Sequence, residues 1–158
     1  NPGVAESFEY DGTNWSEGGD LNTGRRFIGT SGILTAGIAA GGMTTVAVAN
    51  TETYNGTSWT EVGDLGTARY AGAAFGTTSS AVHATGAISP PGAVSALVEE
   101  YSGVAWAEVA NVSSARKKTP SSGSGTSSSA VIFGGNDPDF STATEEWTKA
   151  QNIKTITD

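Results

Sequence analysis

Cysteine is absent from this 158-residue chain, which excludes disulfide bonds, thiolate nucleophiles and cysteine-ligated zinc. Charged residues are also sparse, at 15%, which suits short strands joined by tight turns. The 8 basic and 16 acidic residues give a net charge of −8. This balance predicts no nucleic-acid partner, because phosphate backbones and anionic surfaces attract basic patches. No hydrophobic run approaches the ~20 residues of a membrane span, so we expect no membrane insertion.

A block that begins with tyrosine and ends with tryptophan recurs along the chain. Its tyrosines recur at intervals of 44 and 47 residues, and the arginines that follow each block keep the same intervals. The repeated positions are Tyr10, Trp15 and Arg25, then Tyr54, Trp59 and Arg69, then Tyr101, Trp106 and Arg116. A period in this range indicates a repeat architecture, in which each unit is one supersecondary element.

One repeat contains four short segments that are typical of strands. Gly32 is expected to break the chain after the first, and Asn55-Gly56 predicts a type I′ turn between the third and fourth, because both central residues of that turn need positive φ. The expected strands are 27–31, 33–40, 51–54 and 57–62. Four antiparallel strands in about 45 residues are the unit of a β-propeller blade.

The whole chain divides into about three and a half such units. We predict an all-β domain over 1–158, made of a half blade (4–24), two blades (25–68 and 69–115) and a terminal blade (116–158). Trp147 holds the tyrosine position in the terminal blade, and 152–157 is its expected fourth strand. This gives fourteen strands. The half blade leaves an unpaired strand edge, which upstream residues of a longer protein or another copy would cover.

Catalytic chemistry finds little support in the sequence. His83 is the only histidine, so a Ser–His–Asp triad would have to recruit this one ring. Aligned on the glycine that closes the strand, His83 takes the position of Ala39 and Ile132, and we expect a half-buried strand residue. Glu99 and Glu100 are adjacent and point to opposite strand faces, which makes them a poor glycosidase pair. The sequence predicts no enzyme.

The loop around Asp137 and Asp139 is rich in oxygen ligands. Calcium takes 6–8 oxygen ligands, and this loop supplies too few of them. We therefore interpret it as a turn, and the sequence predicts neither a metal nor a cofactor.

The order of arginine, glycine pair, tyrosine and tryptophan resembles the kelch repeat. The matching positions are Gly41-Gly42, Tyr54, Trp59 and Arg69 in one repeat, and Tyr101, Trp106, Arg116 and Gly134-Gly135 further on. Two departures are visible. Thr85-Gly86 stands where a glycine pair is expected, and the tyrosine and tryptophan are only 5 residues apart. The resemblance implies four-stranded, kelch-like propeller blades over nearly the whole chain.

Three shorter motifs resemble kelch-like repeat proteins of tailed phages, notably those of marine cyanobacteria. These motifs occupy 51–60, 64–69 and 143–147. The phage resemblance implies a virion location, in a tail fibre or another surface appendage, with other virion proteins or further copies of the chain as partners.

The repeated side chains admit two interpretations. The aromatic residues form either a platform that stacks on sugars or the packing between neighbouring blades, and we favour packing. The arginines either bind anionic ligands or pair with one glutamate of each repeat, and we favour pairing. The expected carboxylates are Glu52, Glu99 and Glu145.

The sequence leaves three functions in competition. The first is a non-enzymatic virion protein that assembles and presents loops, with host-surface attachment through a glycan as a further role. The second is a secreted carbohydrate-binding propeller, whose pocket would be formed by the loops that contain Pro90, Pro91, Asp137 and Asp139. The third, a glycan-cleaving enzyme, lacks an identifiable catalytic pair.

Overall fold

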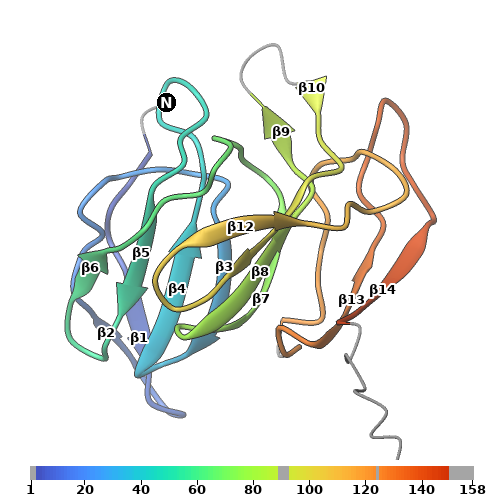
Figure 1. The fold of residues 1–158 in the computed structure, drawn as a ribbon. Coiled ribbons are helices and arrows are strands. Elements are labelled where there is room, and N and C mark those ends of the chain that lie inside the picture. The colour runs from blue at the N-terminus through green and yellow to red at the C-terminus, as the bar shows by residue number, and fades with distance from the viewer. Residues whose placement is uncertain (1–2, 89–92, 124, 150–158) are drawn as a thin grey trace, which may run out of the picture.

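The computed structural model describes residues 3–88, 93–123 and 125–149 (Figure 1). These residues form fourteen strands and no helix, so the described part of the chain also contains no apolar helix able to cross a membrane. The strands form two four-stranded antiparallel sheets and three two-stranded hairpins. The prediction of an all-β fold with four-stranded antiparallel sheets is confirmed for these two sheets.

The four-stranded sheets are named A and B. Sheet A contains, in spatial order, β3 (Gly29–Ile33), β4 (Ala36–Ala40), β5 (Thr51–Tyr54) and β6 (Trp59–Glu61). Sheet B contains β7 (Ala73–Thr77), β8 (Ser80–Ala84), β11 (Val98–Tyr101) and β12 (Trp106–Val109). In both sheets each strand pairs with its neighbour in the repeat, which is the meander expected of one blade.

The remaining strands form hairpins. The N-terminal hairpin pairs β1 (Phe8–Tyr10) with β2 (Trp15–Glu17), and the C-terminal hairpin pairs β13 (Ser129–Phe133) with β14 (Thr144–Thr148). A short hairpin of β9 (Ala87–Ile88) and β10 (Ala93–Val94) extends from sheet B. Figure 1 shows the N-terminal hairpin and the C-terminal hairpin at opposite ends of the array. The strand pairings of the described residues do not close it into a ring.

The described residues contain fourteen strands, the number predicted for the whole chain, but the two sets have different members. The hairpin of β9 and β10 was not predicted, because each strand has only two residues and is too short to show an alternating pattern. In the terminal repeat, the expected first strand is reduced to an isolated bridge between Ser121 and Ile132. The serine- and glycine-rich segment that begins at Ser121 does not supply a regular run of side chains. The expected fourth strand at 152–157 lies outside the described residues.

Two turn predictions were wrong. Gly32 does not break the chain but lies inside β3, and the turn falls at Leu34-Thr35. Asn55 does not have positive φ, which excludes a type I′ turn at Asn55-Gly56. Four residues instead separate the paired Tyr54 and Trp59. The Asn55 side chain satisfies this longer loop, because its Oδ1 accepts from the amides of Thr57 (2.9 Å) and Ser58 (3.0 Å).

Gly32 and Gly37 face each other across β3 and β4 and offer a matched test of backbone strain. Gly32 has φ +113°, and an added Cβ would lie 2.2 Å from the Ala36 carbonyl oxygen, whereas a Cβ on Gly37 meets Tyr54 at an ordinary 3.5 Å. We expect Gly32→Ala to lower the free energy of unfolding by about 2–3 kcal/mol. Gly37→Ala should change it by less than about 1 kcal/mol. Urea denaturation measures both, and equal losses would contradict the strand assignment.

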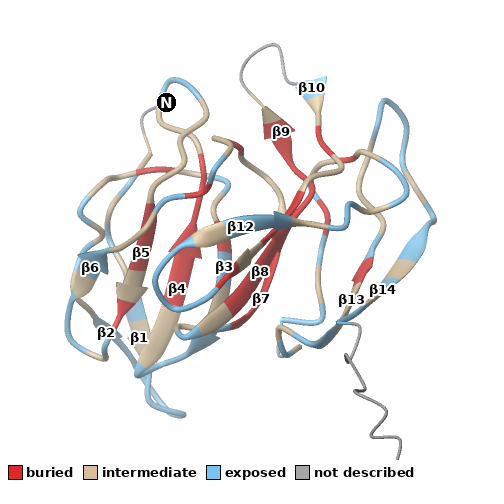
Figure 2. Ribbon diagram, in the orientation of Figure 1, coloured by how far each residue is buried: buried red, intermediate tan, exposed pale blue. Residues whose placement is uncertain are grey.

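Two apolar clusters lie between consecutive sheets. Between sheets A and B, Ile38 packs with Ala81 and Tyr101. Between sheet B and the C-terminal hairpin, the buried cluster consists of Ala73, Phe75, Val82, Ala84, Val98 and Ile132. Figure 2 shows that burial concentrates in β4, β5, β7 and β8, and that the terminal hairpins are more exposed. The core is therefore a series of interfaces between repeats.

Backbone hydrogen bonds also connect one repeat to the next. The Ala71 amide donates to the Phe27 carbonyl (2.8 Å), and the Lys118 amide donates to the Ala71 carbonyl (2.6 Å). All three residues have positive φ, between 54° and 57°. Each lies two positions after a repeat arginine. The same unusual backbone conformation thus recurs in three repeats and links them in series.

Candidate functional site: the repeated side chains between sheets

The repeated tyrosine and tryptophan are direct cross-strand partners. The ring centroids are 5.1 Å apart for Tyr10 and Trp15, 5.0 Å for Tyr54 and Trp59, and 5.1 Å for Tyr101 and Trp106. The interplanar angles are 35°, 35° and 36°, so the three pairs share one geometry. Aromatic pairs of this kind stabilise a hairpin from one face of its strands.

The second and third pairs contact the preceding repeat. The Tyr54 hydroxyl donates to the Glu9 carboxylate on β1, and the Trp106 indole Nε1 donates to Thr51 Oγ1 on β5 at 3.1 Å. Tyr101 is 1% exposed. These contacts support the packing interpretation for both pairs. The first pair differs, because Tyr10 and Trp15 are 48% and 69% exposed.

The structure contains all three predicted arginine–glutamate ion pairs. Arg25 pairs with Glu52, Arg69 with Glu99 (3.1 Å), and Arg116 with Glu145 (2.8 Å). The three arginine side chains are at most 1% exposed. Each arginine lies before the first strand of its sheet or hairpin. Its side chain reaches the carboxylate on the third strand of the same repeat. Burial leaves these guanidinium groups inaccessible to an anionic ligand from solution.

Each carboxylate also holds the loop that precedes its own arginine. The backbone amides of Asn22, Gly66 and Ser113 donate to Glu52, Glu99 and Glu145 at 2.7, 2.6 and 2.8 Å. These three amides lie three positions before the arginines. Burial alone would raise the pKa of Glu52, but hydrogen bonds from Arg25 and Asn22 outweigh it and hold the pKa below its ordinary 4.5. The carboxylate therefore remains charged and structural at neutral pH.

The arginines differ in how completely their nitrogens are bonded. Arg25 donates to the carbonyls of Gly41 (2.9 Å), Ala39 (3.2 Å) and Thr23 (3.2 Å) as well as to Glu52. Arg116 is ion-paired with Glu145, yet its buried nitrogens have no well-aligned hydrogen bond among the described residues. The terminal repeat thus keeps the charge pair without the carbonyl contacts that Arg25 makes.

His83 is fully buried, which corrects the expectation of a half-buried residue. Its Nδ1 accepts from Arg69 Nε at 3.1 Å, and its backbone carbonyl accepts from the same guanidinium at 3.1 Å. An added Cβ on Gly29 or Gly72 would lie only 2.7 or 2.5 Å from the ring. Two glycines therefore make room for a ring that Ala39 and Ile132 do not require, which is why alignment alone did not predict its burial.

Acid should destabilise the fold through His83. Burial and then the Arg69 charge hold the His83 pKa well below 6.5, so the folded state keeps a neutral ring while the unfolded state binds a proton below that pH. As the pH is lowered from 6.5, we expect the free energy of unfolding to decrease by at most about 1.4 kcal/mol per pH unit. The Glu52 contribution disappears only as the pH falls below 4.5.

Urea denaturation of the wild type and of His83→Gln, at several pH values from about 7 to about 5, measures this effect. Gln retains an acceptor for Arg69 but cannot titrate. The slope below pH 6.5 should therefore flatten in this variant. An unchanged slope would assign it to other groups.

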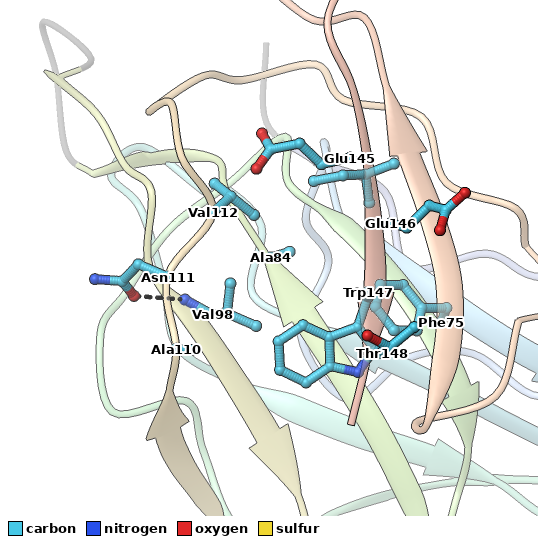
Figure 3. Close-up of a pocket in the computed structure, with 11 residues that line it drawn as sticks. Phe75, Ala84, Val98, Ala110, Asn111, Val112, Glu145, Glu146, Trp147 and Thr148 are labelled. Carbon is cyan, nitrogen blue, oxygen red and sulfur yellow. Dashed lines mark hydrogen bonds between the residues drawn. The ribbon is translucent and has the colours of Figure 1, made fainter. Parts of the chain in front are cut away.

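A cleft of about 220 Å³ lies between sheet B and the C-terminal hairpin. Figure 3 shows the Trp147 indole projecting toward Val98. Phe75, Val112 and Ile132 also line it. Glu145 lies at the same cleft but is already bonded to Arg116 and to the Ser113 amide. Most of the lining side chains are apolar, so the cleft provides an apolar contact surface.

Only one of the two predicted ligand loops lies within the described residues. Pro90 and Pro91 lie outside the described residues. Asp137 and Asp139 line a separate hollow of about 240 Å³ together with Arg116. Among the described residues, no group of three or more histidine, aspartate or glutamate side chains is arranged to hold a metal ion. The pocket between the two loops stays a prediction.

The Thr85-Gly86 departure from the glycine pair has a local explanation. Thr85 adopts φ +64°, the same conformation as Gly41 (φ +65°) and Gly134 (φ +61°). Positive φ is unusual for a β-branched residue. The Thr85 hydroxyl donates to Thr119 Oγ1 at 3.0 Å, a contact that no glycine makes. The repeat geometry is thus preserved although its residue signature is lost.

Comparison with known proteins did not assign a family. No protein-family model matches the chain, and a search of curated proteins also found no match.

Proposed function

We propose that this chain is a kelch-like propeller module that serves as a non-enzymatic structural component of a phage particle, in a tail fibre or another surface appendage. The phage-like motifs support the location, and the meander order of sheets A and B supports the blade assignment. Its partners are other virion proteins or further copies of the chain, and host-surface attachment is a secondary role.

One observation carries the structural role. The side chains that recur in every full repeat are used to hold repeats together: Tyr101 is buried against Ile38 of the preceding sheet, and Glu99, the partner of Arg69, accepts from the Gly66 amide of the preceding repeat. A catalytic or ligand-binding surface would need some of these groups to be accessible. The recurrent chemistry of the chain is therefore directed at cohesion between repeats.

A carbohydrate-binding module is the alternative, and the exposed Tyr10–Trp15 pair favours it. Trp15 is 69% exposed and its ring is tilted 35° from that of Tyr10, so the pair presents a free aromatic surface. Sugars stack on such surfaces. The pair is nevertheless the first member of a series whose other members contact protein, and this series favours the assembly role.

Mass spectrometry of purified phage particles tests the proposed location. Peptides that cover the Tyr54–Trp59 and Tyr101–Trp106 blocks should occur in a constant ratio to the known capsid and tail proteins through successive density gradients. Recovery of the chain only in the soluble fraction of lysed host cells, with none in the particles, would contradict a virion role. A parallel glycan array would then test the alternative.

A further inference from the structure

The N-terminal hairpin presents an aromatic face without a partner among the described residues. Phe8, Tyr10 and Trp15 are 61%, 48% and 69% exposed. Tyr10 is paired with Trp15 and Phe8 with Glu17, so these side chains share one face of the hairpin. Phe8 stands where the later repeats have the arginine-paired glutamates. This face is therefore equivalent to the tyrosine–tryptophan faces of sheets A and B, but it has the apolar Phe8 where they have a carboxylate.

The interface between sheets A and B shows what covers such a face. The equivalent pair in sheet B, Tyr101 and Trp106, packs on sheet A. It contacts the face of sheet A that lies opposite the Tyr54–Trp59 pair. Ile38 contacts the tyrosine there, and Thr51 Oγ1 accepts from the tryptophan Nε1. Ala40 lies on the same face, because it is the register partner of Thr51. We call this arrangement, Ile38 with Ala40 and Thr51, the receiving face.

The C-terminal hairpin carries an equivalent receiving face. Ala39 pairs with Glu52 and Ile132 pairs with Glu145, which aligns β4 with β13 and β5 with β14. The positions of Ile38, Ala40 and Thr51 are then held by Val131, Phe133 and Thr144.

This second receiving face is open to contact. Phe133 is 42% exposed, and Thr144 is exposed. Glu146, the register partner of Val131, is exposed beside them. Figure 1 shows this hairpin at the end of the array opposite β1 and β2. One chain therefore carries an aromatic face at one end and a matching receiving face at the other.

We propose that copies of this chain associate head to tail, with the Tyr10–Trp15 face of one copy seated on the Val131–Phe133–Thr144 face of the next. Repeat geometry places the Trp15 Nε1 opposite Thr144 Oγ1, as Trp106 lies opposite Thr51. It places the Tyr10 hydroxyl opposite Glu146, as Tyr54 lies opposite Glu9. This contact is heterologous, so it forms a ring or a filament. The inference deepens the proposed assembly role and rests on it.

Two variants separate the two faces. Trp15→Asp places a charge on the aromatic face, and Phe133→Asp places one on the receiving face. Val104→Asp is the matched control, because Val104 is an apolar residue that is 78% exposed on a hairpin loop outside both faces. Circular dichroism and thermal melting first establish that all three variants fold like the wild type. Sedimentation velocity at increasing protein concentration then measures the association of each.

The wild type and Val104→Asp should form species larger than the 15.9 kDa chain. Each face variant alone should remain monomeric or associate at least about tenfold more weakly. A one-to-one mixture of Trp15→Asp with Phe133→Asp should form a dimer and nothing larger, because only one intact pair of faces remains. This mixture distinguishes head-to-tail association from contact between two identical faces.

Three results would overturn the proposal. They are a wild type that stays monomeric, whether its aromatic face then binds a glycan or another polypeptide segment; face variants that associate like the wild type; and a mixture that stays monomeric. None of these results bears on whether the chain occurs in phage particles, so a failure of this interface is distinguishable from a failure of the proposed location.

Discussion

Arg25→Met is expected to lower the free energy of unfolding by about 3–5 kcal/mol, because it leaves the Glu52 carboxylate buried without its partner. The side chains of Arg25 and Glu52 are 0% and 1% exposed. Methionine fills much of the space of the arginine stem, so the loss reports mainly the missing charge and its hydrogen bonds. Urea denaturation followed by tryptophan fluorescence measures the change.

Lys149→Met is the control for this prediction. Lys149 pairs with Glu100 at 2.6 Å, but its side chain is 53% exposed, so its removal should cost at most about 1 kcal/mol. The double variant Arg25→Met/Glu52→Leu should be more stable than Arg25→Met alone, because no uncompensated charge remains. Similar losses for Arg25→Met and Lys149→Met would show that the repeat ion pairs are not structural.

Tyr101→Ala is expected to destabilise the chain by about 3–5 kcal/mol, the usual cost of removing a buried large aromatic side chain. Its ring is 1% exposed, packs on Ile38 of the preceding sheet and lies 5.1 Å from the Trp106 ring. The substitution therefore removes one packing unit between sheets A and B. Thermal and urea denaturation of dilute protein provide the measurement.

Tyr10→Ala is its matched control, because Tyr10 holds the same repeat position but is 48% exposed. In dilute, monomeric protein this variant should lose less than about 1 kcal/mol. If both tyrosine variants lost the same stability, the exposed face of the N-terminal hairpin would have to be buried in the monomer. The comparison thus tests position in the array at constant residue type.

The sequence predicted the side chains that recur with constant type. Tyrosine, tryptophan and arginine recur together, and a glutamate stands two positions before the tyrosine position of each later repeat, so a repeat carboxylate could be expected as the partner of each arginine. The backbone links could not be found in this way. Phe27, Ala71 and Lys118 adopt one unusual conformation and link three repeats, yet they share no residue type. There the repeat conserves the backbone and leaves no signature in the side chains.

The local turns show a second limit of sequence patterns. Asn55-Gly56 satisfies the residue preference of a type I′ turn, but the cross-strand pairing of Tyr54 and Trp59 determines a loop two residues longer. Asp11 bonds the backbone of its own hairpin in the same way as Asn55. The aromatic pair and the Asx-type contacts therefore override the local preference of the dipeptide. Tertiary packing decided the register, and the dipeptide alone could not reveal it.

If copies associate head to tail, one chain is an open array whose two ends meet only between copies. Because the chain has no cysteine, spin labels can be placed at Ser16→Cys on β2 and Thr142→Cys beside β14 without other reactive sites. Both positions are exposed and lie at opposite ends of the array. Packed sheets lie ~10 Å apart, so end-to-end contact brings the two labels close together.

Electron–electron distance measurement on the doubly labelled chain, undiluted and diluted into a large excess of unlabelled chain, separates the two arrangements. We expect the undiluted sample to contain a short distance, and the diluted sample to lose it and keep only the longer distance within one chain. A short distance that persists at full dilution would mean that a single chain closes on itself, and would contradict the open array and the head-to-tail association inferred from it.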